Sequence, residues 1–178
     1  MKKYPRILIS IVLIGTSLVL TSVSAANVVR VNMLLTAWFN AGFGMTSEHA
    51  GGIPQNVMIP VLEVFDAKGN ATLFAAGQDE AEKALKDLPA KLKNLRSLTG
   101  YQSANKLFTL MKDDKGQPFK AVQLDKSLPT VVYIGLSTCK SCVLVHKDLN
   151  NFLHMHPKLR ANVLDVSIEC PQCPQHNY

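Results

Sequence analysis

Two cysteines, Cys139 and Cys142, stand where the hydrophobic pattern of the chain changes. The residues before them, Thr130 to Leu136, form an apolar run of strand length, and Val143 to Phe152 repeats apolar residues at helical spacing. The pair is therefore expected at a turn between a strand and the start of a helix. Unpaired backbone N–H groups and the positive end of the helix dipole stabilise a thiolate at such a turn and lower its pKa. The pattern predicts a redox-active pair with a helix directly behind it.

The two cysteines are expected to have different roles. Cys139 is nearer the helix start and the solvent, so it is the expected catalytic nucleophile, and Cys142 is the expected resolving thiol. Lys140 adds a positive charge between them. The alternative is a static disulfide or an idle pair. The helix is expected to bury the apolar side chains of Val143, Leu144, Leu149, Phe152 and Leu153.

The N-terminal residues have the composition of an export signal. Lys2, Lys3 and Arg6 precede an apolar run from Ile7 to Val23, and small residues follow up to Ala25. We expect residues 1–25 to be a signal peptide that is cleaved after Ala25, and the remaining protein to be located in the periplasm. The alternative is an uncleaved anchor, because the run approaches the lower limit of about 17 residues for a membrane-spanning helix.

Charge and length limit the class of protein. Without residues 1–25, 153 residues remain, enough for one domain, and the 16 basic and 13 acidic residues among them leave a net charge of +3. This small excess, with no basic run interleaved with aromatic residues, argues against nucleic acid as a partner. The sequence also shows no phosphate-binding glycine loop and no Ser/His/Asp arrangement.

A hairpin and a long helical stretch are expected in the middle of the chain. Val57 to Phe65 and Ala71 to Ala76 are apolar, and turn-forming residues separate them. Ala81 to Leu98 carries a stripe of alanine and leucine at helical spacing, with Pro89 marking a kink or a restart.

The remaining segments are less regular. Leu107 to Met111 and Phe119 to Leu124 suggest a second, weaker hairpin, and Asn162 to Ile168 is the expected last strand. Residues 26–55 are expected to form a helix, over Met33 to Phe39, followed by a glycine-rich loop, and residues 170–178 an irregular tail. The aromatic residues Trp38, Phe39 and Phe43, which lie in residues 26–55, are expected to fill the core rather than form a groove for a peptide.

A second cysteine pair, Cys170 and Cys173, follows the last expected strand. If that strand runs parallel to Thr130 to Leu136, both cysteine pairs emerge at the same edge of the sheet. Three interpretations remain open: a structural disulfide, a second redox pair that relays electrons, or a metal site shared by both pairs. Surface exposure is the expected state of the nearby histidines, His146, His154, His156 and His176.

The stretch from Leu107 through Pro129 to Ile134 and on to the cysteine pair resembles the thioredoxin-like family, in particular its exported members. The resemblance covers about residues 107 to 168. It implies an α/β fold with a central mixed sheet flanked by helices, spanning residues 26–178. It also implies a thiol-disulfide oxidoreductase without a cofactor, whose partners are protein thiols or disulfides and a membrane or periplasmic redox partner. One departure is that Ser137 and Thr138 replace the aromatic residue usual before the first cysteine.

A larger departure is that the chain ends where the family continues with a cis-proline, a hairpin and a helix. The segment from Ile59 and Pro60 through Ala76 to the helix after Gly77 resembles that missing half. We therefore expect a circularly permuted thioredoxin-like domain in which Pro60 lies against the cysteine pair as a substrate-binding residue. The alternative is an ordinary hairpin attached elsewhere, with a trans Pro60.

These patterns favour a periplasmic thiol-disulfide oxidoreductase, and the direction of its electron transfer stays open. Two other functions remain as alternatives. One is a non-catalytic thioredoxin-like assembly factor of a secretion or conjugation system, in which the cysteines are structural. The other is a carrier of copper or zinc.

Overall fold

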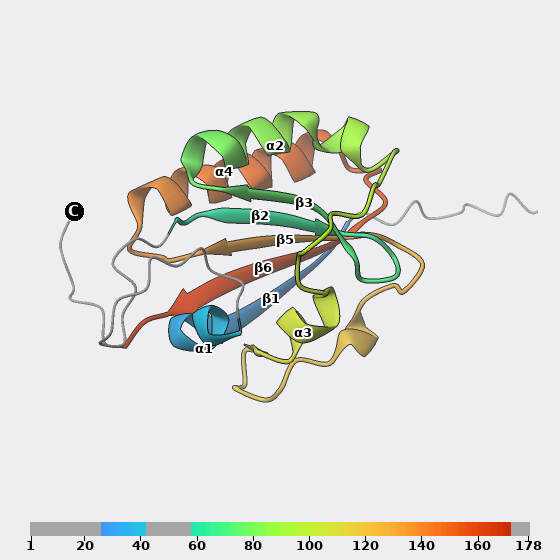
Figure 1. Ribbon diagram of the computed structural model, residues 1–178. Helices are drawn as coiled ribbons and strands as arrows, with labels where there is room; N and C mark the ends of the chain where they lie inside the picture. Colours follow the sequence, from blue (N-terminus) through green and yellow to red (C-terminus); the bar gives the residue numbers. More distant parts are fainter. Residues whose placement is uncertain (1–25, 42–57, 172–178) are drawn as a thin grey trace, which may run out of the picture.

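The computed structural model describes residues 26–41 and 58–171 (Figure 1). The predicted signal peptide, Phe43, Cys173 and His176 lie outside the described residues. Among the described residues, none of the helices combines the length and the apolar character needed to cross a membrane.

A six-stranded mixed sheet forms the centre of the molecule, with strand order β3-β2-β5-β6-β1-β4. Strand β6 runs parallel to both of its neighbours, β5 and β1. The other three pairs, β2 with β5, β3 with β2 and β4 with β1, are antiparallel. The strands are β1 (Asn27–Leu34), β2 (Val61–Phe65), β3 (Ala71–Ala76), β4 (Met111–Lys112), β5 (Thr130–Gly135) and β6 (Asn162–Glu169).

Helices cover both faces of this sheet (Figure 1). One face carries α2 (Gln78–Lys91) and α4 (Lys140–Met155), and the other carries α1 (Leu35–Asn40) and α3 (Ala104–Phe108) with the 3-10 turn η1 (Ala121–Gln123). Each face has its own apolar cluster. The predicted fold class, a thioredoxin-like central mixed sheet flanked by helices, is confirmed.

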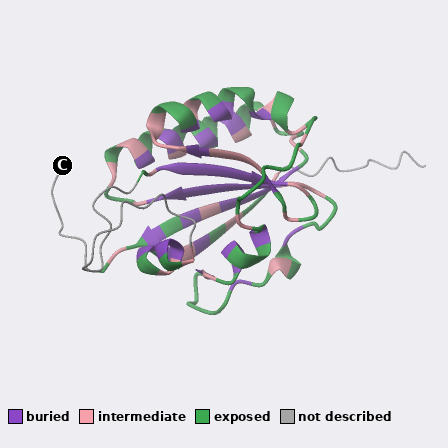
Figure 2. Cartoon of the chain, in the orientation of Figure 1, coloured by how far each residue is buried: buried purple, intermediate pink, exposed green. Residues whose placement is uncertain are grey.

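Two neighbouring strands inside the sheet, β2 and β5, are covered on both faces. Every residue of β2 and β5 is buried, as Figure 2 shows for both arrows. Strands covered on both faces consist of continuous apolar runs rather than alternating ones. The predicted strands at these positions and the predicted β2–β3 hairpin are confirmed.

The turn of that hairpin is held by Asp66. Its carboxylate accepts hydrogen bonds from the backbone N–H groups of Lys68 and Asn70, both at 2.9 Å. Gly69 adopts a φ of 84°, a conformation that glycine tolerates without a side-chain clash. After the hairpin, α2 runs through Pro89 and ends at Lys91, so the second helix expected after a restart, up to Leu98, does not form.

Two sequence-based expectations are wrong. Asn27–Leu34, expected as part of a helix and loop, is a strand that pairs with β6 along its whole length, and the helix begins only at Leu35. Leu107 and Phe108, expected in a strand, belong to α3, because they bury one helical face together with Ala104. The second hairpin is reduced to the two residues of β4 and one bridge between Lys112 and Pro118.

The buried side of α4 also differs from the prediction. Val143 and Leu144 are 53% and 43% exposed. The inward positions are instead Cys142, Val145, Leu149 and Phe152, at spacings of three and four residues. Cys142 is one of these inward positions, so the second cysteine of the pair lies in the core.

Candidate redox site

The predicted cysteine pair forms a disulfide at the start of α4. Cys139 and Cys142 are bonded through their sulfur atoms, and their Cα atoms are 5.2 Å apart. Cys139 is the N-terminal cap of α4 and is half-buried, whereas Cys142 is only 1% exposed. Cys139 is therefore the more exposed residue of the pair, and Cys142 is covered.

The Cys139 sulfur lies among hydrogen-bond donors of the first helical turn. The backbone N–H of Cys142 donates to Cys139 Sγ at 3.1 Å, and Ser141 Oγ lies 3.2 Å from the same sulfur. The first N–H groups of a helix have no partner inside the helix, so a sulfur at this position accepts one of them. This is the environment that the strand-turn-helix pattern predicts for Cys139.

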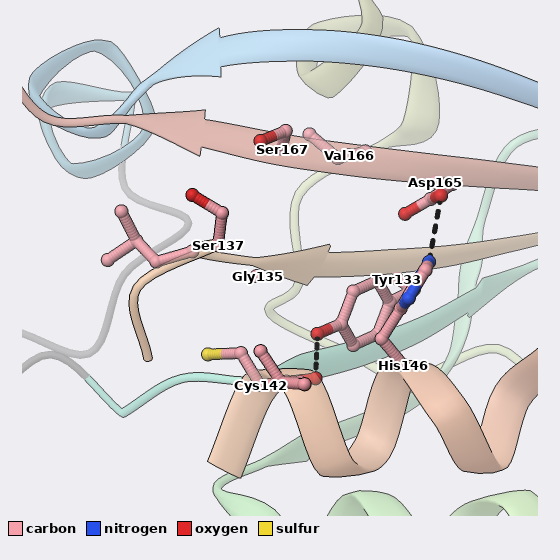
Figure 3. A pocket seen from close by; sticks show the side chains of 10 residues that line it. Tyr133, Gly135, Ser137, Cys142, His146, Asp165, Val166 and Ser167 are labelled. Atoms are coloured by element: carbon pink, nitrogen blue, oxygen red, sulfur yellow. Dashed lines mark hydrogen bonds and ion pairs between the residues drawn. The ribbon is translucent and has the colours of Figure 1, made fainter. Parts of the chain in front are cut away.

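Tyr133 connects this turn to the sheet. Its side chain projects from β5 toward α4, and its hydroxyl donates a hydrogen bond of 2.6 Å to the backbone carbonyl of Cys142 (Figure 3). Burial, with a smaller contribution from the charge of Asp165, raises the pKa of Tyr133 well above its usual value of 10. The hydroxyl therefore stays protonated and remains a donor at neutral pH.

Gly135 makes room for this tyrosine. A Cβ atom at position 135 would overlap the Tyr133 hydroxyl and lie 2.8 Å from Cζ of the ring. Because real Cβ atoms do not approach other heavy atoms so closely, a side chain at 135 would displace the ring. Glycine is needed here for space.

A cavity of about 290 Å³ opens beside the disulfide, between α4 and the ends of β5 and β6 (Figure 3). In its wall, His146 Nε2 lies 2.9 Å from a carboxylate oxygen of Asp165, and the His146 ring contacts Tyr133 with centroids 5.4 Å apart. Arg30 approaches the same carboxylate at 3.8 Å but is 84% exposed, so it contributes little. His146 was expected to be a solvated histidine, and it is instead half-buried in this wall.

Pro60 stands at the same end of the sheet as the disulfide. Its peptide bond with Ile59 is cis, so the alternative of a trans Pro60 is wrong. The next residue, Val61, pairs with Ile134, and β5 ends one residue later, before the loop that leads to Cys139. The predicted contact between Pro60 and the cysteine pair stays a prediction.

The second cysteine pair is only partly described. Strands β5 and β6 are parallel and joined by α4, as expected, and Cys170 follows the end of β6 at the edge where the Cys139–Cys142 disulfide lies. Cys170 is disulfide-bonded and packs against the apolar cluster on the α1 and α3 face. Cys173 lies outside the described residues, and within them no group of three or more potential metal ligands occurs.

Glu63 is a buried carboxyl that the sequence analysis did not single out. It lies in the centre of β2, opposite Val132 on β5, is 3% exposed, and its Oε2 atom has no hydrogen-bond partner among the described residues. Burial raises its pKa to about 8. Val61 and Phe65, on either side, belong to the cluster on the α1 and α3 face, so Glu63 faces away from the disulfide.

The fold and the site together define an α/β protein with a six-stranded mixed sheet flanked by helices and a disulfide at the start of one of these helices. Comparisons of the chain with models of protein families, with curated proteins and with solved structures found no match. The function is therefore argued from the geometry of the site.

Proposed function

We propose that the chain is a periplasmic thiol-disulfide oxidoreductase that exchanges disulfides with protein partners. The observation that carries this proposal is the asymmetry of the pair, with Cys139 accessible at the helix start and Cys142 buried behind it. This arrangement favours attack by a partner at Cys139, while Cys142 stays close enough to displace that partner afterwards.

The proposed exchange consists of two steps. In the reduced protein, the Cys139 thiolate attacks one sulfur of a partner disulfide and forms a mixed disulfide, while the other partner sulfur leaves as a thiolate. Cys142 then loses its proton and attacks Cys139 Sγ, which releases the second partner thiolate and restores the Cys139–Cys142 disulfide. Two electrons pass to the partner, and the reverse sequence oxidises it.

The surroundings of Cys139 support its role as the nucleophile. The Cys142 N–H bond to Cys139 Sγ, the Ser141 hydroxyl and the start of the 16-residue helix α4 all favour a negative charge on this sulfur. A lowered thiol pKa increases the thiolate fraction at neutral pH. Lys140, exposed between the two cysteines, acts in the same direction.

Membership of the thioredoxin-like family, in a circularly permuted form, is part of the proposal. The β2–β3 hairpin and α2 precede β5 in the chain, but β2 pairs with β5 in the sheet and α2 shares an apolar cluster with α4, as the family's final hairpin and helix do. The cis bond at Pro60 directly before β2 supports the same correspondence. Pro60 is then the proposed substrate-binding residue.

Export to the periplasm rests on the composition of residues 1–25. Cys139, Cys142 and Cys170 are disulfide-bonded, which supports a periplasmic location, because disulfides persist in oxidising compartments. The proposed partners are protein thiols or disulfides and a periplasmic or membrane-bound protein that resets the pair.

The test is the reduction of insulin by dithiothreitol and the refolding of a reduced, scrambled protein, each with catalytic amounts of the full chain. We expect activity in the wild type, its loss in Cys139→Ser, and a trapped mixed disulfide in Cys142→Ser. Asn151→Ala is the control expected to stay as active as the wild type, since it changes an exposed residue of the same helix, away from the cysteine pair, and keeps both sulfurs. A wild type without turnover, or a Cys139→Ser variant as active as the wild type, would contradict the proposal and leave a non-catalytic scaffold.

A further inference from the structure

A second hollow lies at the end of the molecule away from the disulfide. It is formed by the end of α2 and the loop between α4 and β6, which Figure 1 shows together at that end, and its volume is about 550 Å³. Because α4 has 16 residues, its C-terminal end is about 24 Å from Cys139. We call this hollow the distal groove, lined by Pro89, Leu92, Lys93, Met155, His156, Pro157, Lys158, Leu159 and Arg160.

The wall of the distal groove is largely apolar. Leu92 and Leu159 are half-buried and pack against the cluster beneath α2 and α4. Met155 is 69% exposed, although it is a large apolar residue beside these two leucines. An apolar wall of this size with a few polar groups is typical of sites for small amphipathic ligands.

The charged residues that line the distal groove all have the same sign. Lys93, Lys158 and Arg160 are exposed there, and the lining contains no aspartate or glutamate. None of these three cations has an ion pair with a described residue, although the charge of Arg160 also acts on Asp125 outside the lining. A ligand that fits this arrangement carries an apolar chain and an anionic head group.

The position of the groove in the chain also points to lipid. Ala26, the first described residue, packs against the same cluster as Leu92 and Leu159, so the preceding residues join the domain at this end. Their sequence contains the apolar run Ile7 to Val23, together with three cations and no acidic residue. A basic segment does not complement a basic rim, so this segment is a poor occupant of the groove. If it acts as the export signal proposed above, the end of the domain that carries the groove is the end tied to the membrane before cleavage.

We propose that the distal groove binds an anionic lipid, with the acyl chain on the wall of Leu92, Met155 and Leu159 and the phosphate or carboxylate head at Lys93, Lys158 and Arg160. This site is independent of the redox function. It would orient the molecule with the distal groove toward the lipid and the disulfide about one helix length away from it.

The experiment uses the full chain and a dodecyl phosphate that carries a photoreactive diazirine on its alkyl chain, below its micelle concentration. After irradiation, mass spectrometry maps the labelled peptides. We expect labelling of residues 89–93 and 155–160, and at least a tenfold loss in the charge-reversed variant K158E/R160E. K83E/K86E is the matched control, because it reverses two exposed charges on α2 outside the groove and is expected to label like the wild type. Circular dichroism confirms that both variants are folded.

Competition experiments with the wild type identify the source of the lipid. Vesicles of phosphatidylglycerol, but not of phosphatidylcholine, should remove the label if the natural ligand is a bilayer lipid, and dodecanoate alone should remove it if the ligand is a free fatty acid; either result supports the site. Neutral dodecanol should compete at least tenfold more weakly than dodecyl phosphate. Labelling outside both peptides, labelling unchanged in K158E/R160E, or equally strong competition by an acidic peptide without an alkyl chain would overturn the proposal.

Discussion

The hydroxyl of Tyr133 donates to the backbone carbonyl of Cys142 over 2.6 Å, and this bond joins the redox turn to the centre of the sheet. Tyr133 is 4% exposed and lies on a strand that is buried throughout. The position of Cys142 relative to β5 is therefore set by a rigid side chain and not only by the loop before Cys139. The bond therefore links the first turn of α4 directly to β5.

The first prediction concerns that bond. Tyr133→Phe keeps the ring and removes the hydroxyl, so the free energy of unfolding of the oxidised protein should fall by about 1 kcal/mol, the usual contribution of one buried hydrogen bond. The measurement is urea unfolding with the disulfide intact. Tyr101→Phe is the control, because Tyr101 is 49% exposed and its hydroxyl has no such acceptor among the described residues. Equal stability of the two variants would show that the bond contributes nothing.

The second prediction concerns Gly135. Gly135→Ala should lower the free energy of unfolding by roughly 1–3 kcal/mol, because the new methyl group collides with the Tyr133 ring. Ser137→Ala, two residues further and exposed, should change it by less than about 0.5 kcal/mol.

A double-mutant cycle separates this collision from other effects of a residue at position 135. Tyr133→Leu removes the ring atoms that the methyl group would meet, so Gly135→Ala should be less harmful in the Tyr133→Leu background by about 1 kcal/mol or more. An identical loss in both backgrounds would place the cause elsewhere.

The local sequence pattern was enough to predict those elements in which the preference of neighbouring residues agrees with the packing around them. The apolar runs of β2 and β5, the turn at Asp66 and the helix start at Cys139 were all predictable, because each is specified by residues within a few positions. The parallel arrangement of β5 and β6 followed from the helix between them. The spacing of the two cysteines allows the disulfide, but an idle pair and a metal site shared with Cys170 and Cys173 were equally compatible with the sequence.

Other features depend on partners distant in the sequence. The strand Asn27–Leu34 exists because β6 lies beside it, and its polar residues Asn27, Arg30 and Asn32 hide the strand pattern. Leu107 and Phe108 form a helix because a core lies beneath them. The wall of Tyr133, His146 and Asp165 joins three elements, so no single segment reveals it, although a tyrosine in an otherwise aliphatic strand is a signal that could have been used.

The third prediction concerns Asn162, which ties the loop before β5 to the start of β6. Its side chain is 1% exposed, accepts from the N–H of Asp125 and donates to the Asp125 carbonyl, both at 2.9 Å. Asn162→Ala leaves both groups without this partner and should cost about 2–3 kcal/mol in the free energy of unfolding. Asn151→Ala, at an exposed position on α4, should cost less than about 0.5 kcal/mol. Similar losses in the two variants would contradict this role.

The fourth prediction concerns Glu63 and pH. Its pKa is about 8 in the folded protein against an ordinary value of 4.5, so between these pH values the folded chain holds a proton that the unfolded chain has lost. Stability should therefore fall as pH rises from about 5 to 8, by on the order of 4 kcal/mol, and this group should contribute no further change above that range.

Glu63→Gln has no proton to lose, so this variant should not show the fall in stability. Urea unfolding of both proteins at pH 5, 6.5 and 8 measures the difference. Glu82→Gln, at a half-buried position on α2, is the control, and its free energy of unfolding should change with pH as in the wild type. The same change with pH in Glu63→Gln would contradict the prediction.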